Sequence, residues 1–340
     1  MKKTSLLMII SAVLVVVGIA TCFAGALLIA DDAFTITADG IRFYDADVQR
    51  AFEEYVTENE FFQSPVKEIV QKEARFNTVF TRIIVETINA DVKFVFGQLD
   101  SFACEYTYPD NIPITVSQQD ETLIIKEKDD RFFLFKTPLK KRPQIKIYIP
   151  ENTTISTIRC SSVSGDIICS DSHGVVVKDL QLSNTSGNII FTNFAAGKAT
   201  LSTTSGKITS GMLYISTSLD VSSVSGDLSF SATSNHLTAR TVSGNLTMER
   251  FTAGECNFET TSGEIRVTGR ANDRVRIDSV SGHVYLTIAD RPKSITFNFQ
   301  SVSGHYISEE VPQEMTGECK VFVETVSANL LLNFEHGYIS

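Results

Sequence analysis

The chain has 340 residues, 43% of them hydrophobic, and its 40 acidic residues outnumber its 30 basic residues to give a net charge of −10. This hydrophobic content excludes an intrinsically disordered chain. The acidic balance argues against nucleic acid as a partner, because surfaces that bind nucleic acid are basic.

The first thirty residues predict a membrane anchor. Residues 1–4 include two lysines, residues 5–30 are uncharged and mostly apolar, and Asp31 and Asp32 follow. The apolar stretch has 26 residues, more than the ~20 that a helix needs to cross a bilayer. Lysines before the stretch and acids after it place the N-terminus in the cytoplasm. We therefore expect a cytoplasmic tail over residues 1–4, a single-pass helix over residues 5–30 and a location at the cell membrane, with the bulk of the chain outside.

Two alternatives to this anchor stay open. One is a cleaved signal peptide, since Ala24-Gly25-Ala26 resembles a cleavage site. The apolar stretch is longer than the ~7–15 residues of a signal peptide, however, and continues past that site. The other is a lipoprotein modified at Cys22, although Thr21 is an unusual residue before a lipidated cysteine.

Residues 31–75 are expected to form a juxtamembrane segment with two short amphipathic helices within residues 45–75. Ser64-Pro65 is typical of a cap followed by proline in a first helical turn. These helices would act as a spacer from the membrane or would cover the first coil of the next domain. The apolar residues at helical spacing are Val48, Phe52, Tyr55 and Val56 in the first helix and Val66, Ile69 and Val70 in the second.

Residues 76–150 show a strand pattern with irregular spacing. Residues 87–92 match the phrase that repeats later in the chain, and Ile145, Ile147 and Ile149 alternate with polar residues. We interpret this part as the irregular first coils of a repeat domain. A basic loop precedes the isoleucines and would contact anionic lipid or wall polymer, or remain solvated; its residues are Lys136, Lys140, Lys141 and Arg142.

Residues 151–340 repeat one short phrase nine times. A typical copy is S-S-V-S-G-D-I at 161–167, and the last copy has Ala328 in place of the glycine. The copies recur every 18 to 24 residues, which is typical of repeat architectures. The repeat glycines, which we expect at chain corners because glycine reaches backbone angles closed to other residues, are Gly165, Gly187, Gly206, Gly226, Gly244, Gly263, Gly282 and Gly304.

Apolar residues stand five and seven places before each repeat glycine, usually with a polar residue between them. This period of two predicts a strand with one buried face. A single coil cannot bury its own apolar face, but coils stacked about 4.8 Å apart can. The predicted fold is therefore all-β: a β-solenoid of about 20-residue coils, preceded by a transmembrane helix and a short helical juxtamembrane segment.

The sequence predicts no catalytic residue, cofactor or metal. A serine that precedes the corner in all nine copies indicates hydroxyls that satisfy one another and the corner backbone. His283 and His305 follow repeat glycines one coil apart in sequence, and Glu264 holds the same place in the coil before, which indicates polar residues on an exposed corner. Cys160 and Cys256 stand at core positions. Cys104, Cys169 and Cys319 complete an odd set of five, so no disulfide is predicted.

The ninth copy carries apolar residues on normally polar faces. Phe322 and Leu331 stand where earlier copies are mostly polar, and the chain ends soon afterwards. Exposed apolar patches tend to mark contacts. We therefore predict that these two side chains are covered, by a second molecule end to end or by residues 97–150 of the same chain.

Several features together resemble a known family. They are the lysine-led membrane span, the A-D-V phrase at 90–92, the strand ending Ile147-Tyr148-Ile149-Pro150 and the serial S-G-D/N-I/L corners. They are similar to the bacterial "putative adhesin" β-strand-repeat family, a domain of unknown function common in membrane-anchored proteins of Gram-positive bacteria. The resemblance covers residues 80–340 and the anchor. It implies a β-repeat fold in the cell envelope and supplies no catalytic residues.

Three functions are compatible with these observations. The first is a non-enzymatic surface protein that acts as an adhesin or scaffold, with protein or cell-wall polymer as partner and with self-association open. The second, implied by the family, is an accessory component of an envelope stress or signalling system. The third is a glycan-cleaving enzyme on a β-solenoid, which needs clustered carboxylates on one coil face. Scattered acids disfavour the third.

Overall fold

The computed structural model describes residues 34–37, 40–43, 69–109, 113–128, 142–172, 174–289, 295–308 and 318–334. The chain divides into two compact units, one of residues 1–65 and 130–140 and one of residues 66–129 and 141–340. In the first unit, strands β1 (Phe34–Thr37) and β2 (Gly40–Phe43) pair antiparallel.

The predicted membrane helix over residues 5–30, the first amphipathic helix and the lysines of the basic loop lie outside these described ranges. Within them, the model contains no helix with the length and apolar character needed to cross a bilayer.

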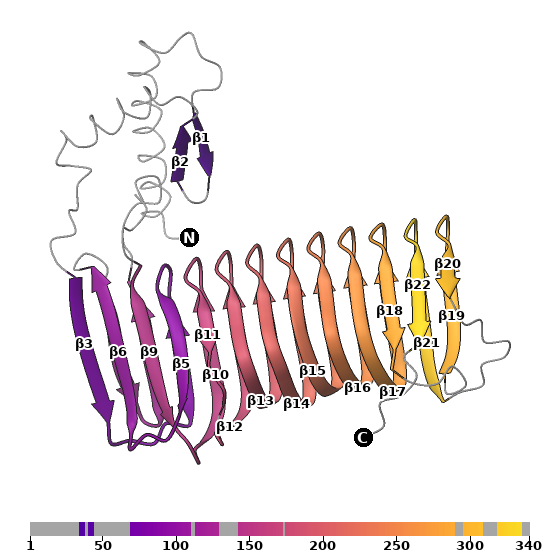
Figure 1. The fold of residues 1–340 in the computed structure, drawn as a ribbon. Coiled ribbons are helices and arrows are strands. Elements are labelled where there is room, and N and C mark those ends of the chain that lie inside the picture. The colour runs from indigo at the N-terminus through magenta and orange to yellow at the C-terminus, as the bar shows by residue number, and fades with distance from the viewer. Residues whose placement is uncertain are drawn as a thin grey trace, which may run out of the picture. The chain divides into compact units, whose positions relative to one another are not determined.

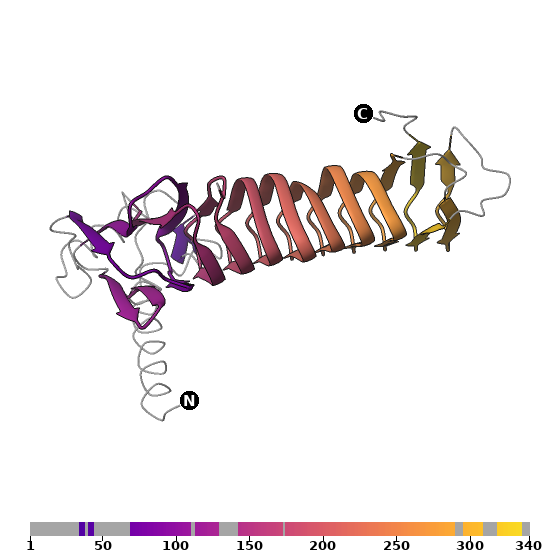
Figure 2. The ribbon, with the colours of Figure 1, turned by 90° about the horizontal axis from the view of Figure 1, so that it is seen from below.

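The second unit is a β-solenoid, as the repeats predict. Its strands stack in parallel, each in register with the strand one coil further along (Figure 1). Each long strand runs from one Ser-Gly corner to the next and continues around the far side of the coil without a break (Figure 2). The strands of this regular part are β10 (Thr154–Ser162), β11 (Ile167–Cys169), β12 (Val176–Asn184), β13 (Ile189–Thr203), β14 (Ile208–Ser223), β15 (Leu228–Thr241), β16 (Leu246–Thr260), β17 (Ile265–Ser279) and β18 (Val284–Ile288).

The core consists of the predicted apolar positions, stacked on one another. Leu180, Ala199 and Leu219 are register partners in successive coils, and Leu237, Cys256 and Val275 continue the same column. All six are buried. Each added coil thus buries the apolar face of the coil before it, which is the main stabilising contribution in a repeat fold.

The N-terminal end of the solenoid is closed by antiparallel strands. The first coil, β4 (Arg82–Glu86) and β5 (Asp91–Gly97), lies between the regular coils and a layer made of β8 (Thr122–Glu127) and β9 (Gln144–Pro150). Strand β7 (Ile114–Gln119) then runs antiparallel along β8, and β6 (Phe102–Pro109) runs antiparallel along β9. Strand direction reverses here, so the parallel stack of coils does not continue at this end.

The prediction of a second amphipathic helix is wrong for residues 69–76, the part of it that the structure describes. Ile69–Phe76 forms strand β3, which pairs antiparallel with β6 over its whole length. Local spacing favoured a helix, but the edge of β6 offers this segment a complete set of backbone hydrogen bonds. Val70 and Phe76 also pack against the core from this position. Strand formation depends on such tertiary contacts more than on local sequence.

Glu127 caps the first corner from the end of β8. Its Oε2 accepts the backbone N–H groups of Ile88, Asn89 and Ala90 at 2.8, 2.8 and 2.9 Å, and its side chain is almost fully buried. In later coils a preceding coil supplies a carbonyl acceptor to the corner, as Ile88 does to the N–H of Ser164 at 2.8 Å. The carboxylate therefore replaces the coil that is missing at this end.

The C-terminal coils are not stacked in chain order. The last coil, β21 (Cys319–Thr325) and β22 (Leu330–Phe334), pairs in parallel with β17 and β18. The coil that precedes it in sequence, β19 (Ile295–Ser301) and β20 (Tyr306–Ser308), pairs with the other side of β21 and β22. Figure 1 shows yellow β22 between β18 and β20. The last coil in sequence is thus the second last in space, contrary to the expectation that it forms the end.

We predict that Glu127→Gln lowers the free energy of unfolding by about 2 kcal/mol, because hydrogen bonds to a charged group contribute roughly 1.5–3 kcal/mol. Chemical denaturation of the full chain in detergent measures this change. The matched control is Glu86→Gln, which removes a half-exposed ion pair to Lys126 and is expected to cost less than about 1 kcal/mol. Equal midpoints for the two variants would contradict the capping role.

Candidate functional site

The Ser-Gly corner is the most regular feature of the solenoid, and its glycine is required by crowding. A Cβ added at any of the eight repeat glycines would lie 1.7 to 2.3 Å from the carbonyl oxygen of the corner residue in the preceding coil. Positive φ angles at glycine occur at Gly174 and Gly269, and at none of these eight. The expectation of special backbone angles is therefore wrong, because the constraint is the close approach of stacked backbones.

A buried polar side chain closes each corner from three places before the glycine. The Ser223 hydroxyl accepts the Gly226 N–H at 2.8 Å, and Thr203 and Thr241 act in the same way on Gly206 and Gly244. These side chains are buried, although they are polar. This position was not among the predicted residues, although Ser, Thr or Asn stands there in every copy of the repeat.

The serine before each glycine ties one coil to the next. Ser164 Oγ donates to the Ile88 carbonyl at 3.0 Å, and Ser186 Oγ donates to the Val163 carbonyl at 3.0 Å. The equivalent serines of later coils make the same contact with a backbone carbonyl. The hydroxyls therefore serve the corner backbone, as predicted.

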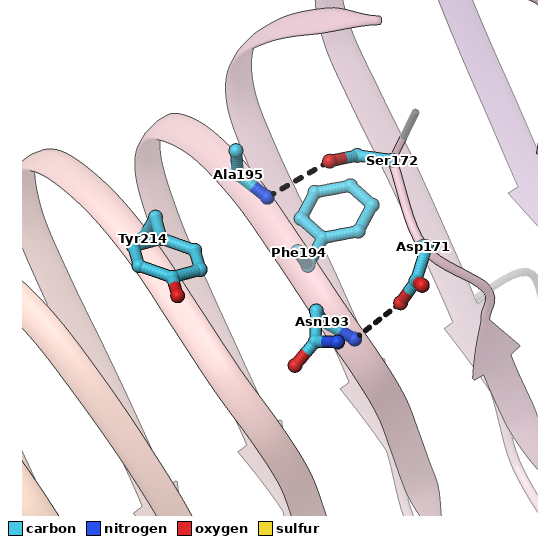
Figure 3. A pocket seen from close by; sticks show the side chains of 6 residues that line it. All are labelled: Asp171, Ser172, Asn193, Phe194, Ala195 and Tyr214. Carbon is cyan, nitrogen blue, oxygen red and sulfur yellow. Dashed lines mark hydrogen bonds between the residues drawn. The ribbon is translucent and has the colours of Figure 1, made fainter. Parts of the chain in front are cut away.

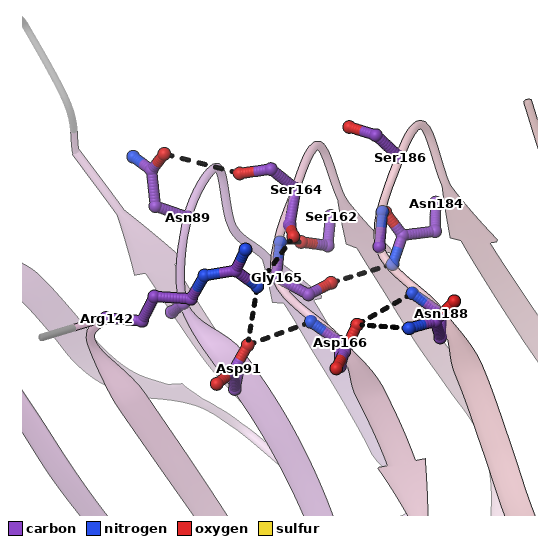
Figure 4. Close-up of polar contacts among 12 residues, drawn as sticks. Asn89, Asp91, Arg142, Ser162, Ser164, Gly165, Asp166, Asn184, Ser186 and Asn188 are labelled. Carbon is purple, nitrogen blue, oxygen red and sulfur yellow. Dashed lines mark hydrogen bonds and ion pairs between the residues drawn. The ribbon is translucent and has the colours of Figure 1, made fainter. Parts of the chain in front are cut away.

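The residue after each glycine forms a second ladder of hydrogen bonds. Asp91 Oδ1 accepts the Asp166 N–H at 3.0 Å, and Asp166 Oδ1 accepts the Asn188 N–H at 2.8 Å (Figure 4). Asn188 Oδ1 then accepts the Lys207 N–H at 3.0 Å. The ladder resumes at Asp227, whose pKa is lowered by the N–H of Asn245 and by Lys207. Short Asp and Asn side chains suit this position because their oxygen reaches the next coil.

The apex of the corners carries an exposed column of β-branched residues, which we call the Val/Thr column. Val224, Val242 and Val280 are 49%, 48% and 45% exposed. Such exposure is unusual for valine, and the spacing of the column is that of the coils, about 4.8 Å. The column members, in their spatial order, are Val163, Thr185, Thr204, Val224, Val242, Thr261, Val280, Val326 and Val302.

Ion pairs link neighbouring coils on an outer face. Arg240 lies 3.1 Å from Glu259 and 4.0 Å from Asp220, and Arg276 lies 3.0 Å from Glu324. These groups are about half exposed, so each pair contributes little stability. Their pairing places acids of this face beside arginines.

A shallow depression of about 240 Å³ lies on the far side of the coils, near the end of β11 (Figure 3). Phe194 is buried there and packs edge-on against Phe96 and Phe191, whereas Tyr214 is exposed. Asp171 accepts the Asn193 N–H at 2.8 Å, and Ser172 accepts the Ala195 N–H at 3.1 Å. The polar groups around the depression therefore tie one coil to the next, as at the corners.

The cysteines are buried thiols. The five described cysteines are all buried, so Cys160 and Cys256 occupy the core as predicted; the other three are Cys104, Cys169 and Cys319. Burial raises the pKa of Cys104 to about 12 and raises the pKa of Cys160 above its ordinary value. Reactivity requires the thiolate, so burial disfavours reaction of Cys104 and Cys160 near neutral pH.

The two corner histidines are not neighbours. Asn329 lies between them, accepting the His305 N–H at 3.0 Å and donating its own N–H to His283 Nδ1 at 3.4 Å. The inserted last coil causes this separation. No group of three metal-ligating side chains occurs among the residues that the structure describes.

Phe322 and Leu331 lie on the inserted coil and not at the end of the stack. Phe322 is the register partner of Arg276 on one side and Asn298 on the other, and Leu331 lies between Tyr285 and Ile307. Both are partly buried by these lateral neighbours. The prediction that residues 97–150 cover them is wrong, because that segment belongs to the opposite end of the solenoid.

The chain is similar to a known protein family and to several solved structures. A family model described as Toastrack DUF4097 matches residues 80–327. No curated protein matches the chain. Among solved structures, a "putative lipid binding protein" from Parabacteroides distasonis is 17% identical, covers 78% of this chain and 97% of its own, and has a TM-score of 0.49. A "putative adhesin" from the same species is 11% identical, covers 79% of this chain and 97% of its own, and has a TM-score of 0.47. A "putative adhesin" from Bacteroides fragilis is 15% identical, covers 78% of this chain and 97% of its own, and has a TM-score of 0.43.

We predict that Gly226→Ala destabilises the solenoid by at least about 2 kcal/mol, because the new Cβ would overlap the Gly206 carbonyl and force two coils apart. The control is Gly97→Ala, where a Cβ meets nothing within 4 Å. Denaturant midpoints of the two variants and the wild type test the prediction. A Gly226→Ala midpoint as high as that of Gly97→Ala would show that the coils are not packed this closely.

Proposed function

The chain belongs to the Toastrack DUF4097 family, and we propose that it is a non-enzymatic protein of the cell envelope. In this proposal residues 5–30 anchor it in the membrane and the solenoid presents a binding surface outside the cell. Its partner is an extended molecule, either a cell-wall polymer or a protein segment, and its role is that of an adhesin or scaffold.

The Val/Thr column is the observation that carries this proposal. It offers the same exposed β-branched group at each of nine corners, with five of the six valines between 45% and 49% exposed. Exposed apolar surface that a folded protein retains tends to mark contacts. A straight, periodic column of about 40 Å suits a partner that is itself extended, since nine coils at about 4.8 Å give this length.

The chemistry of the remaining surface supports binding over catalysis. The corner hydroxyls donate to backbone carbonyls, and acids such as Glu255 and Glu259 pair with arginines. The described thiols are buried, and burial raises the pKa of Cys104 and Cys160. Each of these groups is thus already engaged in holding the solenoid together.

The anchor makes a first testable prediction. N-terminal analysis of the mature protein from membranes should find a chain that begins at or next to Met1, because an apolar stretch of 26 residues is long enough to remain as a helix in the bilayer. Mass spectrometry of the N-terminal peptide measures this. A mature chain that starts at Leu27 or carries a lipid on Cys22 would contradict the uncleaved anchor.

Site-specific photo-crosslinking in cells tests the binding surface. We expect the full chain with a benzophenone side chain in place of Val224 or Val242 to form covalent adducts, because both positions face the partner. The control places the same group at exposed Asn235, away from the corners. Digestion of the adduct with protease or with wall hydrolases distinguishes a protein from a polymer. Adducts that are absent, or equally abundant at Asn235, would contradict the proposal.

A further inference from the structure

Four exposed cations lie along one side of the first four coils, one on each coil. We call them the basic patch, and they are Arg82 on β4, Arg159 on β10, Lys178 on β12 and Lys198 on β13. The register of these strands places Arg82 and Lys198 in one row, three coils apart, and Arg159 lies in the next row. The patch thus extends for about 14 Å along the stack, since neighbouring strands are about 4.8 Å apart.

These cations lack the acids that pair with arginines further along the same face. Arg240, Arg274 and Arg276, on β15 and β17, each lie 2.8 to 3.1 Å from an acid. Among the residues that the structure describes, no member of the basic patch forms an ion pair. Asp179 is the acid among the four cations, and its Oδ2 accepts Nε2 of Gln181 at 2.6 Å. The patch therefore keeps a local excess of positive charge in a chain whose net charge is −10.

The spacing of the patch suits an extended anion. A small anion is held by several donors that converge on one place. The basic patch instead offers one cation on each successive coil, so a polymer that carries anionic groups at intervals can contact several of them at once. Each contact at an exposed site is weak, and the binding strength comes from their number.

A row of serines lies beside the patch, on its Val/Thr column side. Ser161, Ser183 and Ser202 are register partners in successive coils. Ser161 stands two residues after Arg159 and two residues before Val163 of the column. Unlike the corner serines, these three have no hydrogen bond at Oγ among the described residues. Their hydroxyls are therefore available to donate to, and accept from, the hydroxyl groups of a ligand.

We propose that the basic patch binds an anionic wall polymer, in which phosphate or carboxylate groups alternate with sugar or polyol units. This inference rests on the proposed function, because it assigns a chemical class to the extended partner. The guanidinium groups of Arg82 and Arg159 match the planar geometry of such anions, and Lys178 and Lys198 supply point charges. The serine row meets the hydroxyls of the intervening units. A narrow polymer contacts the patch alone, whereas an anionic bilayer surface also repels the other, acidic parts of the chain.

Equilibrium binding of synthetic poly(glycerol phosphate) to the full chain in phosphatidylcholine nanodiscs tests this proposal. The wild type should bind this polymer in preference to neutral dextran, and binding should weaken as salt is added, because salt screens exposed charges. The variant Arg159→Gln, Lys198→Gln should raise the Kd by about fivefold or more, since it removes two of the four contacts. The matched control, Arg250→Gln, Arg270→Gln, removes two exposed arginines from β16 and β17 and should leave the Kd unchanged.

Both variants should keep the wild-type denaturant midpoint, because the substituted side chains are exposed. A wild type that does not bind the polymer overturns the proposal, as do two variants that weaken binding equally. Phosphatidylglycerol vesicles that bind the wild type when the polymer does not would assign the patch to a membrane surface instead. Photo-crosslinks at Val224 without polymer binding would overturn this inference and leave the proposed function in place.

Discussion

The structure depends on the close approach of backbones at the Ser-Gly corners. Stacked coils are separated by about 4.8 Å, the spacing of neighbouring strands, and at the corner this distance leaves no room for a side chain between them. Each repeat glycine therefore lies directly against the carbonyl of the corner before it. The ladders of Ser, Thr, Asp and Asn then fasten the two corners together with hydrogen bonds from both side chains and backbone. If one corner opens, the core columns beneath it lose their register.

Because every coil needs a neighbour, the ends of the stack determine how the whole protein behaves. The N-terminal end is closed twice, by strands that run in the opposite direction and by a carboxylate that takes the place of a missing coil. The C-terminal end has parallel strands and partly buried aromatic rings. Among the described residues, the two ends of the stack are thus built differently.

Much of the fold could be predicted from the sequence. The alternation of apolar and polar residues determines which side chains face the core, and the repeat determines which residues are register partners in neighbouring coils. The column from Leu180 to Val275 follows from this pattern alone. The order of the last coils could not be predicted this way, since any coil with the same alternation can stack on any other. The longest spacing, 24 residues from Gly304 to Ala328, was the available signal, because extra residues allow the chain to pass over a coil. Strand β3 was missed because its partner β6 is distant in sequence and local spacing favoured a helix.

The corner residues show why the function of a repeat protein is difficult to predict from its sequence. Nine copies of one phrase serve packing, so the serines, glycines and short acids in them are explained by the solenoid itself. Binding must then depend on side chains that do not take part in the packing of one coil on the next. One feature that meets that condition is the Val/Thr column, whose side chains point away from the core. The column repeats the same contact many times, so it favours weak binding strengthened by avidity along an extended partner.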